Sequence, residues 1–320
     1  MTDPQYLKGK IYFFFYIFGD SDLKNCHKIG EGVYGEVYLW RARNAQARVM
    51  KIVPIAGTTK VNGEHQKDYH EIISEIVIAI FIFIFYFYIS KLHIFQVLAV
   101  RCLYGPYPSR LLDLWELFDE VKGSENDNPA VLPADQQFVV LELANAGQDL
   151  ESYQFNSAEQ AYALFWQVAF GLAVGEESMQ FEHRDLHWGN VLLKHVIFLW
   201  RNSKINLWKT VFIIYLFFQD SVSLYNDLGS DESLFSAVGD YQFHVYRLMR
   251  EKLSNEWKNF EPFTNILWLH YTVDKMITSL RYKRTNTKIH KHYISKLKGI
   301  KNRILEYNSA TDFVLTDNEL

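Results

Sequence analysis

The chain has 320 residues, of which 49% are hydrophobic and 22% charged; this excludes a disordered chain and describes one large or two small folded domains. Its 33 basic and 37 acidic residues give a net charge of -4, so no overall basic field marks a nucleic-acid-binding protein. The two cysteines, Cys26 and Cys102, exclude a disulfide framework and favour a reducing compartment.

Three apolar runs hold much of the aromatic content, which is 16% of the chain. They are residues 11–18 (IYFFFYIF), 76–89 (IVIAIFIFIFYFYI) and 211–218 (VFIIYLFF). The longest is shorter than the roughly 20 residues that a membrane-spanning helix needs, so we expect no transmembrane segment. Buried strands or a core helix are the first interpretation; a secretory signal at 11–18 and membrane association through 76–89 are the alternatives.

Residues 28–60 alternate like strands around a glycine-rich turn with the pattern G-x-G-x-x-G-x-V. The residues of this turn that we expect to contact a nucleotide are Gly30, Glu31, Gly32, Val33, Gly35 and Val37. Glycines let backbone amides approach phosphates closely, because no Cβ stands in the way. A Rossmann turn or a simple hairpin has similar glycines, but a Rossmann site needs a helix after the last glycine, where EVYLWRA is strand-like.

A lysine at the end of the next apolar strand favours a kinase nucleotide site. Lys51 follows Val37 by 14 residues and is a candidate to pair the α- and β-phosphates, although taken alone it also fits a solvated strand lysine. A helix predicted over 64–80 offers Glu75 as the carboxylate that holds Lys51. Glu71, one turn earlier on the same face, is the alternative.

The middle of the chain predicts a polar loop at 121–130, a strand at 135–143 and then a helix. Ser157 and Gln160 form a capping box for this helix, which should run to about residue 180. These elements lead directly into the most specific motif of the sequence.

Residues 183–190 read HRDLHWGN, the pattern of a protein-kinase catalytic loop. In such a loop Asp185 accepts the proton of the substrate hydroxyl and Asn190 holds a magnesium ion, and the four-residue gap lets one loop present both side chains to one phosphoryl group. With the glycine-rich turn and Lys51 in the right order, this motif predicts a protein-kinase fold.

The C-terminal part predicts helices at 241–252 and 263–280, followed by a last amphipathic helix. Its apolar stripe is Ile289, Tyr293, Leu297, Ile300 and Ile304. Residues 281–303 carry nine Lys or Arg and no acid. A solvated helix face is the plainer interpretation of this charge, and contact with DNA phosphates is the alternative.

Five segments resemble the haspin family of atypical protein kinases. They are HRDLHWGNVLLK from residue 183, GDYQFHVYRLM at 239–249, NILWLHYTVDKM at 265–276, VNGEHQKDYHEIISEI at 61–76 and NSATDFVL at 308–315. The resemblance implies a bilobal α+β kinase fold with a β-rich N-lobe and a helical C-lobe. We expect an N-terminal extension at 1–27, the N-lobe at 28–142, a hinge at 143–149 and the C-lobe at 150–320.

The same resemblance implies an activity. A haspin-like serine/threonine kinase would transfer the γ-phosphate of ATP, with Mg²⁺, to a threonine in the N-terminal tail of a core histone during mitosis. We accordingly expect a monomer in the nucleus and on mitotic chromosomes that binds a histone tail and is associated with chromatin. Sequence-specific nucleic-acid binding is not expected.

Roles follow residue by residue from the matching motifs. Lys51 and Glu75 resemble the ATP-positioning pair, Leu143 the gatekeeper before a hinge that includes Asn145, and Asp149 the aspartate that contacts the ribose. The expected substrate contacts are His187, Asp231 and Glu232, with Asp227 in the same acidic segment. Asp240 resembles the aspartate that anchors the backbone of the catalytic loop. As in haspins, no A-P-E motif follows, so we expect no activation loop regulated by phosphorylation.

One kinase residue is missing from its expected place. A second magnesium-binding aspartate, in D-F-G or a D-Y-T-like variant, should follow Asn190 closely, but the next acid is Asp220, which matches neither motif. The alternative function is therefore a catalytically impaired pseudokinase that binds nucleotide or histone tail. Each apolar run interrupts or precedes the haspin resemblance, and we hypothesise that the runs 11–18, 76–89 and 195–218 are translated introns. Residues 77–102 of the N-lobe and 195–219 of the C-lobe are accordingly doubtful inserts.

Overall fold

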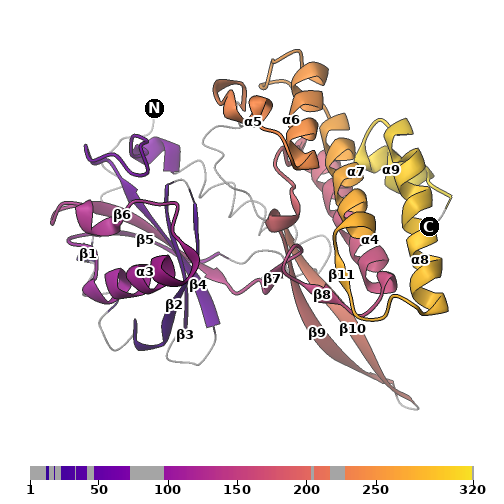
Figure 1. Ribbon diagram of the computed structural model, residues 1–320, viewed down its shortest axis with the longest axis horizontal. Helices are drawn as coiled ribbons and strands as arrows, with labels where there is room; N and C mark the ends of the chain where they lie inside the picture. The colour runs from indigo at the N-terminus through magenta and orange to yellow at the C-terminus, as the bar shows by residue number, and fades with distance from the viewer. Residues whose placement is uncertain are drawn as a thin grey trace. The chain divides into compact units, whose positions relative to one another are not determined.

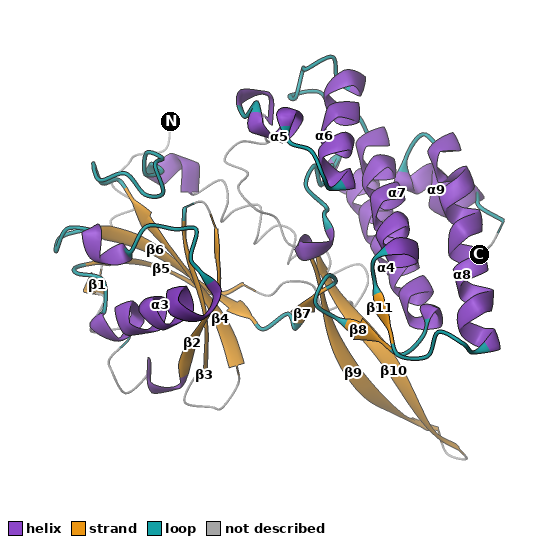
Figure 2. Cartoon of the chain, viewed as in Figure 1, coloured by secondary structure: helices purple, strands orange, loops and turns teal. Residues whose placement is uncertain are grey.

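The computed structural model describes residues 12–13, 18, 23–32, 34–41, 47–72, 97–202, 205–216 and 228–318. Two compact units make up the chain; within the described residues the first ends at Asn145 and the second begins at Ala146 (Figure 1). We call them the N-unit and the C-unit and treat each by itself. Strands dominate the N-unit and helices the C-unit (Figure 2), and the predicted α+β class is confirmed.

The N-unit is built on a six-stranded sheet with the order β1-β5-β6-β4-β3-β2. Its strands are β1 (Tyr12–Phe13), β2 (Cys26–Gly32), β3 (Gly35–Arg41), β4 (Ala47–Ile55), β5 (Val97–Tyr104) and β6 (Gln137–Ala144). Neighbours are antiparallel except β1 and β5, which run parallel. The strands predicted within 28–60 and over 135–143 are thus confirmed as β2, β3, β4 and β6.

Both faces of this sheet are covered, because successive side chains of a strand point to opposite faces. On one face Tyr38 and Phe138 pack with Leu111 and Leu114 of α3 (Ser109–Lys122), which lies along the sheet in Figure 1. The core of the other face consists of Val53, Ile55, Ile72, Val139, Leu141 and Leu143. Helix α3 is not among the predicted elements. Only four residues separate its start from the end of strand β5.

The C-unit is mainly helical. Its helices are α4 (Ala158–Met179), α5 (Ser233–Ser236), α6 (Tyr241–Lys252), α7 (Phe263–Thr278), α8 (Lys288–Arg303) and α9 (Ala310–Thr316). Its strands are β7 (Gln148–Asp149), β8 (Gln154–Phe155), β9 (Val191–Asn202), β10 (Ile205–Leu216) and β11 (Arg281–Tyr282). Helices α6 and α7 confirm the two predictions for this region, and most of the doubtful insert at 195–219 belongs to the antiparallel hairpin of β9 and β10.

Helix α4 begins where the capping box predicts, but its first turn is held differently. The side chain of Ser157 makes no capping bond, and Gln160 Oε1 accepts from the backbone N of Asn156 at 2.9 Å. The amide of Ala158 donates instead to Nδ1 of His290, from α8, at 3.1 Å. A tertiary contact thus replaces the local cap, which a sequence pattern cannot reveal.

The apolar stripe predicted for the last helix is only partly correct. Leu297, Ile300 and Ile304 are fully buried in the C-unit core, and Tyr293 packs against that core. The prediction for Ile289 is wrong, because this residue lies in the first turn of α8 and is 55% exposed. Lys301 and Arg303 pair with Asp274 and Asp317 of the C-unit, whereas most of the other basic residues between 281 and 303 are exposed.

No helix in the described ranges has the length and apolarity needed to cross a bilayer. The run at 76–89, for which membrane association is the alternative interpretation, lies outside the described residues.

We expect the chain to lose stability in mild acid because of two histidines in the C-unit. Burial and the nearby charge of Lys301 lower the pKa of His270, whose Nδ1 lies 2.7 Å from the hydroxyl of Tyr241, and burial lowers the pKa of His290. The unfolded chain takes up protons on both rings below about pH 6.5, where the folded chain resists them. The contribution of these two histidines to stability is therefore fully present above pH 6.5, and it is lost as the pH falls towards their pKa values in the folded chain.

We expect the thermal unfolding midpoint to fall between pH 7.5 and pH 5 and the slope to be reduced in His270→Gln. Scanning calorimetry at several pH values measures this. A midpoint that is flat across this range in the unmodified chain, or a slope that His270→Gln leaves unchanged, would contradict the assignment to His270.

Candidate functional site

The catalytic-loop motif lies between α4 and β9 in the C-unit and ends in a single 3-10 turn, Trp188–Asn190. The side-chain amide of Asn190 donates to the backbone oxygen of Asp185 at 2.8 Å and to its Oδ2 at 3.0 Å. The hydroxyl of Tyr246, from α6, donates to Oδ1 of the same carboxylate at 2.5 Å. Nε2 of His187 lies 3.9 Å from that oxygen. A donor on each oxygen therefore fixes the orientation of the Asp185 carboxylate.

Tyr246 is well placed to act as a permanent donor. Its side chain is buried and packs edge-on against Trp268 of α7, with 5.4 Å between ring centroids. Burial and the adjacent charge of Asp185 raise the pKa of its hydroxyl far above 10, so the proton stays on the tyrosine.

A chain of buried polar groups supports the start of the loop. Asn265 of α7 accepts from the backbone N of His183 at 3.0 Å and donates to the backbone oxygen of Phe181 at 2.9 Å. Its amide also donates to Oε1 of Glu176 at 2.9 Å, and Glu176 in turn accepts from the amides of Ala310 and Thr311 at the start of α9. The carboxylate of Glu176 thus joins three helices beneath the loop.

Arg184 of the motif forms hydrogen bonds with the backbone of the C-unit. Its φ of 61° is in the left-handed region, which residues other than glycine adopt rarely. The guanidinium donates to the carbonyl oxygens of Trp257 and Asn259 and pairs with Glu182 at 2.7 Å. Because these partners occupy several of its donors, Arg184 is poorly available to a phosphate.

The glycine-rich turn of the N-unit joins β2 to β3, with Gly32 opposite Gly35. A Cβ on Gly35 would lie 2.1 Å from the carbonyl oxygen of Ile52 in β4, so this position requires glycine to let the two strands approach. A Cβ on Gly30 would meet nothing within 4 Å. Val33 lies outside the described residues.

Lys51 lies in β4 opposite Val37 of β3 and is 6% exposed. Its expected partner, Glu75, lies outside the described residues. The alternative, Glu71, accepts from the backbone N of Asp68 at 2.6 Å and so closes a capping box at the start of the helix that begins at residue 69. This bond engages one carboxylate oxygen of Glu71, and the assignment of Glu75 as the partner of Lys51 stays a prediction.

The hinge residues flank the end of the N-unit. Leu143, the expected gatekeeper, is buried in β6 opposite Val49 of β4, and Asn145 follows the strand. In the C-unit, Asp149 accepts from the amide and the hydroxyl of Ser152 at 2.6 and 2.8 Å, which closes a turn. A ribose hydroxyl would have to share or displace these bonds.

The strand that carries Asp149 is attached to the catalytic loop. Strand β7 pairs with β9, with Asp149 opposite Leu192. The amide of Leu150 donates to the carbonyl oxygens of Trp188 and Val191 at 3.2 and 2.8 Å. The C-unit therefore brings Asp149, Asp185, His187 and Asn190 into one region.

The acidic residues expected to bind substrate lie before α5. Oδ1 of Asp231 accepts from the amide and the hydroxyl of Ser233 at 3.0 and 2.5 Å. The side chain of Glu232 is 75% exposed and lies 3.2 Å from the guanidinium of Arg250. Asp227 lies outside the described residues.

Asp240 caps α6 by accepting from the amide of Gln242 at 2.9 Å, and it pairs with Lys275 of α7. Burial acts to raise the pKa of Asp240, but these two donors outweigh it and lower the pKa. The ammonium group of Lys275 lies 4.5 Å from the ring centre of Trp188, a cation–π contact. Asp240 thus reaches the catalytic loop through Lys275, whereas its role as a direct backbone anchor stays a prediction.

The donor set does not complete a magnesium site. Since the NH₂ group of Asn190 is bonded to Asp185, its carbonyl oxygen is the atom that can face a cation. The described part of the chain holds no cluster of three or more His, Cys, Asp or Glu arranged for a metal ion. The sequence has no acid from 192 to 219, so the carboxylate that a kinase magnesium site needs is not found there.

Three supporting residues are not among the predicted site residues. Tyr246, Asn265 and Glu176 come from helices, and Tyr246 and Asn265 contact loop residues 61 and 82 positions away in sequence. No local spacing marks them. The signal that could have found two of them is the haspin resemblance, because Tyr246 and Asn265 lie in segments that carry it.

Comparison with known proteins identifies the family of this chain. A family model described as "Haspin like kinase domain" matches residues 7–314. The serine/threonine-protein kinase haspin homolog of Drosophila melanogaster is 41% identical over 312 residues, which cover 90% of this chain and 55% of that protein.

Two further relatives match at somewhat lower identity. Serine/threonine-protein kinase haspin of Bos taurus is 36% identical over 92% of this chain and 40% of its own length. The haspin homolog of Arabidopsis thaliana is 34% identical over 90% of this chain and 49% of its own length. The chain spans about half the length of these relatives. It belongs to the haspin-like kinase family.

Proposed function

We propose that this chain is a serine/threonine protein kinase that transfers the γ-phosphate of ATP to a threonine in the N-terminal tail of a core histone. The observation that carries the proposal is the Asp185 carboxylate, oriented by Asn190 and Tyr246 in a loop with a kinase sequence. Membership of a protein-kinase family supports ATP as the phosphate donor. The histone tail, action in mitosis and a place on chromosomes in the nucleus rest on the haspin resemblance.

The chain's own residues supply the proton transfer. The threonine Oγ forms a bond to the γ-phosphorus, the bond from that phosphorus to the bridging oxygen of ADP breaks, and the threonine proton moves to Asp185. Tyr246 and Asn190 keep the two carboxylate oxygens in place, so little reorganisation is needed when the hydroxyl arrives.

The acidic residues before α5 support a basic peptide as substrate. Glu232 is mostly exposed, and its pair with Arg250 is a surface ion pair of the kind that contributes about 0–1 kcal/mol. An arriving lysine or arginine can displace such a pair at small cost. His187, beside Asp185, would then contact the residues around the threonine.

A peptide assay tests the substrate. Purified chain, ATP and Mg²⁺ are incubated with a peptide of the histone H3 N-terminal tail, or with the same peptide in which each threonine is replaced by valine. We expect phosphate in the first peptide only. Equal incorporation into both peptides would contradict a threonine substrate.

The rival function is a pseudokinase, favoured by the missing acid between 192 and 219. A second carboxylate on the metal would normally help to neutralise charge on the phosphates, so its loss reduces turnover more than nucleotide binding. A chain that binds ATP or the tail peptide, measured by calorimetry, but transfers no phosphate would establish this rival.

Replacing Tyr246 tests the positioning of the base. Tyr246→Phe removes one hydrogen bond to a charged group, and we expect kcat to fall about tenfold while KM for both substrates is unchanged. Tyr282→Phe, which also removes a buried hydroxyl bond in the C-unit, is the matched control and should leave kcat unchanged. Equal effects of both variants on kcat would show that Tyr246 only stabilises the fold.

A further inference from the structure

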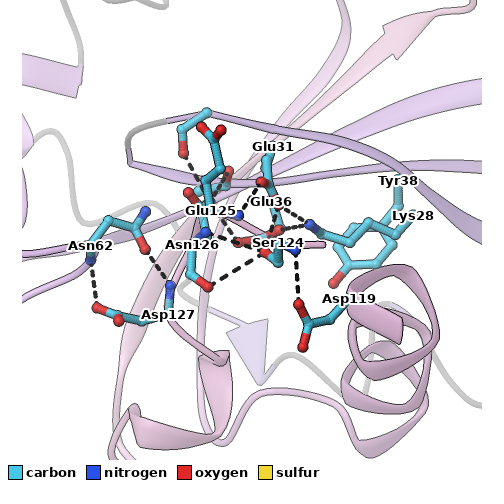
Figure 3. A network of polar contacts seen from close by, with 12 residues as sticks. Lys28, Glu31, Glu36, Tyr38, Asn62, Asp119, Ser124, Glu125, Asn126 and Asp127 are labelled. Atoms are coloured by element: carbon cyan, nitrogen blue, oxygen red, sulfur yellow. Dashed lines mark hydrogen bonds and ion pairs between the residues drawn. The ribbon is translucent and has the colours of Figure 1, made fainter. Parts of the chain in front are cut away.

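A second loop of the N-unit holds the glycine-rich turn. Residues 123–128, which we call the clamp loop, follow α3 and lie against the ends of β2 and β3 (Figure 3). The hydroxyl of Ser124 and the backbone N of Glu125 donate to the two carboxylate oxygens of Glu31, each at 2.7 Å. The clamp loop therefore binds a residue between the first two glycines of the turn.

Asn126 makes the contact with the backbone of the turn. Its side-chain amide donates to the carbonyl oxygen of Gly32 at 3.1 Å and to Oε1 of Glu36 at 2.8 Å, with the carbonyl oxygen of Gly35 at 3.5 Å. These acceptors lie on both strands of the hairpin, so one side chain bridges its two sides.

A buried lysine offsets part of the negative charge at this contact. Lys28 of β2 pairs with Glu31 and, at 2.9 Å, with Glu36, and its ammonium group lies 3.8 Å from the ring centre of Phe118. Partial burial acts to raise the pKa of Glu31, but its bonds from Lys28, Glu125 and Ser124 outweigh this and lower the pKa. The Glu31 carboxylate is thus held in its charged form by donors of the protein, and its role as a nucleotide contact stays a prediction.

We propose that Asn126 and Ser124 are positioning residues that hold the glycine-rich turn in its nucleotide-binding form. Glycines lose more conformational freedom on ordering than other residues, so an unrestrained turn would weaken ATP binding by that cost. Bonds from the clamp loop order the turn before ATP binds. The bonds to Glu31 also hold its negative charge against the clamp loop, in a turn that would lie beside the phosphates of ATP. This inference rests on the proposed function, because it takes ATP as the ligand.

The clamp is tested with Asn126→Ala, measured for ATP binding by calorimetry and for kcat and KM in the peptide assay. Loss of two or three modest hydrogen bonds predicts an ATP affinity about tenfold weaker and a KM for ATP about tenfold higher, with kcat changed less than twofold. Backbone amides of residues 30–36 should exchange with solvent faster. Asn126→Asp, which keeps the shape but replaces the donor by a charge beside Glu36, should weaken ATP binding at least as much.

Asn62→Ala is the matched control. Asn62 exchanges two hydrogen bonds with Asp127, the residue after Asn126, but those bonds do not reach the glycine-rich turn. We expect its ATP affinity to stay within twofold of the unmodified chain. The positioning role of the clamp loop is wrong if both Asn126 variants leave the ATP affinity unchanged. It is also wrong if Asn62→Ala weakens ATP binding as much as Asn126→Ala does. In either case the proposed function stands. If the unmodified chain binds no ATP, both are wrong.

Discussion

Asp185→Asn is expected to reduce kcat for transfer to the tail peptide by about 10²- to 10⁴-fold, the range that a general base contributes. Asparagine keeps the shape of the side chain and can place its oxygen towards the amide of Asn190 and its NH₂ group towards the hydroxyl of Tyr246. The fold should therefore be retained, and only the ability to accept the substrate proton is lost.

Rates measured beside ATP affinity separate a chemical defect from a folding defect. We expect the ATP dissociation constant of Asp185→Asn to stay within about threefold of the unmodified chain, since the substitution removes no nucleotide contact. Asp274→Asn, at an aspartate of α7 that pairs with Lys301 on α8, controls for the loss of a charge elsewhere in the C-unit. A residual rate shared by Asp185→Asn and the unmodified chain would refute an enzymatic role for Asp185.

Glu176→Ala is expected to lower the free energy of unfolding by about 3–5 kcal/mol. The carboxylate accepts four hydrogen bonds in the C-unit interior, from Asn265, the amides of Ala310 and Thr311, and the hydroxyl of Thr311. Alanine would leave these donors without an acceptor where water cannot easily replace it. For a unit of this size the unfolding midpoint should fall by about 10 °C.

The neighbouring Glu177→Ala provides the control for this prediction. Glu177 is on the same helix but exposed, so its loss should change stability by less than about 0.5 kcal/mol. Because Asn265 also holds the backbone of His183, we expect Glu176→Ala to reduce kcat even at temperatures where it remains folded. Thermal unfolding followed by circular dichroism measures the first effect; equal midpoints for both variants would contradict it.

The sequence predicts those parts of the molecule whose chemistry is local. The glycine-rich turn lies between two adjacent strands, β2 and β3, and the catalytic loop brings Asp185 and Asn190 together within six residues. Alternation and amphipathic spacing likewise reveal the strands of the N-unit and the helices α4, α6 and α7. In these cases the residues that determine the structure are neighbours along the chain.

Contacts between distant segments could not be predicted in this way. Asn126 binds Gly32 across 94 positions, Tyr246 binds Asp185 across 61, and the start of α4 is capped by His290 across 132. No periodicity records such pairings, since each is set by tertiary packing. Tertiary packing also decides the exposure of Ile289, which follows the helical spacing but is 55% exposed in α8.

The most direct measurement of the central claim is the number of phosphates that one purified chain transfers from ATP to the histone-tail peptide. A working kinase uses Asp185 repeatedly, so we predict many turnovers per chain, with the phosphate mapped to a threonine by mass spectrometry. Fewer than one phosphate per chain with ATP and peptide both at saturation would contradict the enzyme and leave the pseudokinase as the function.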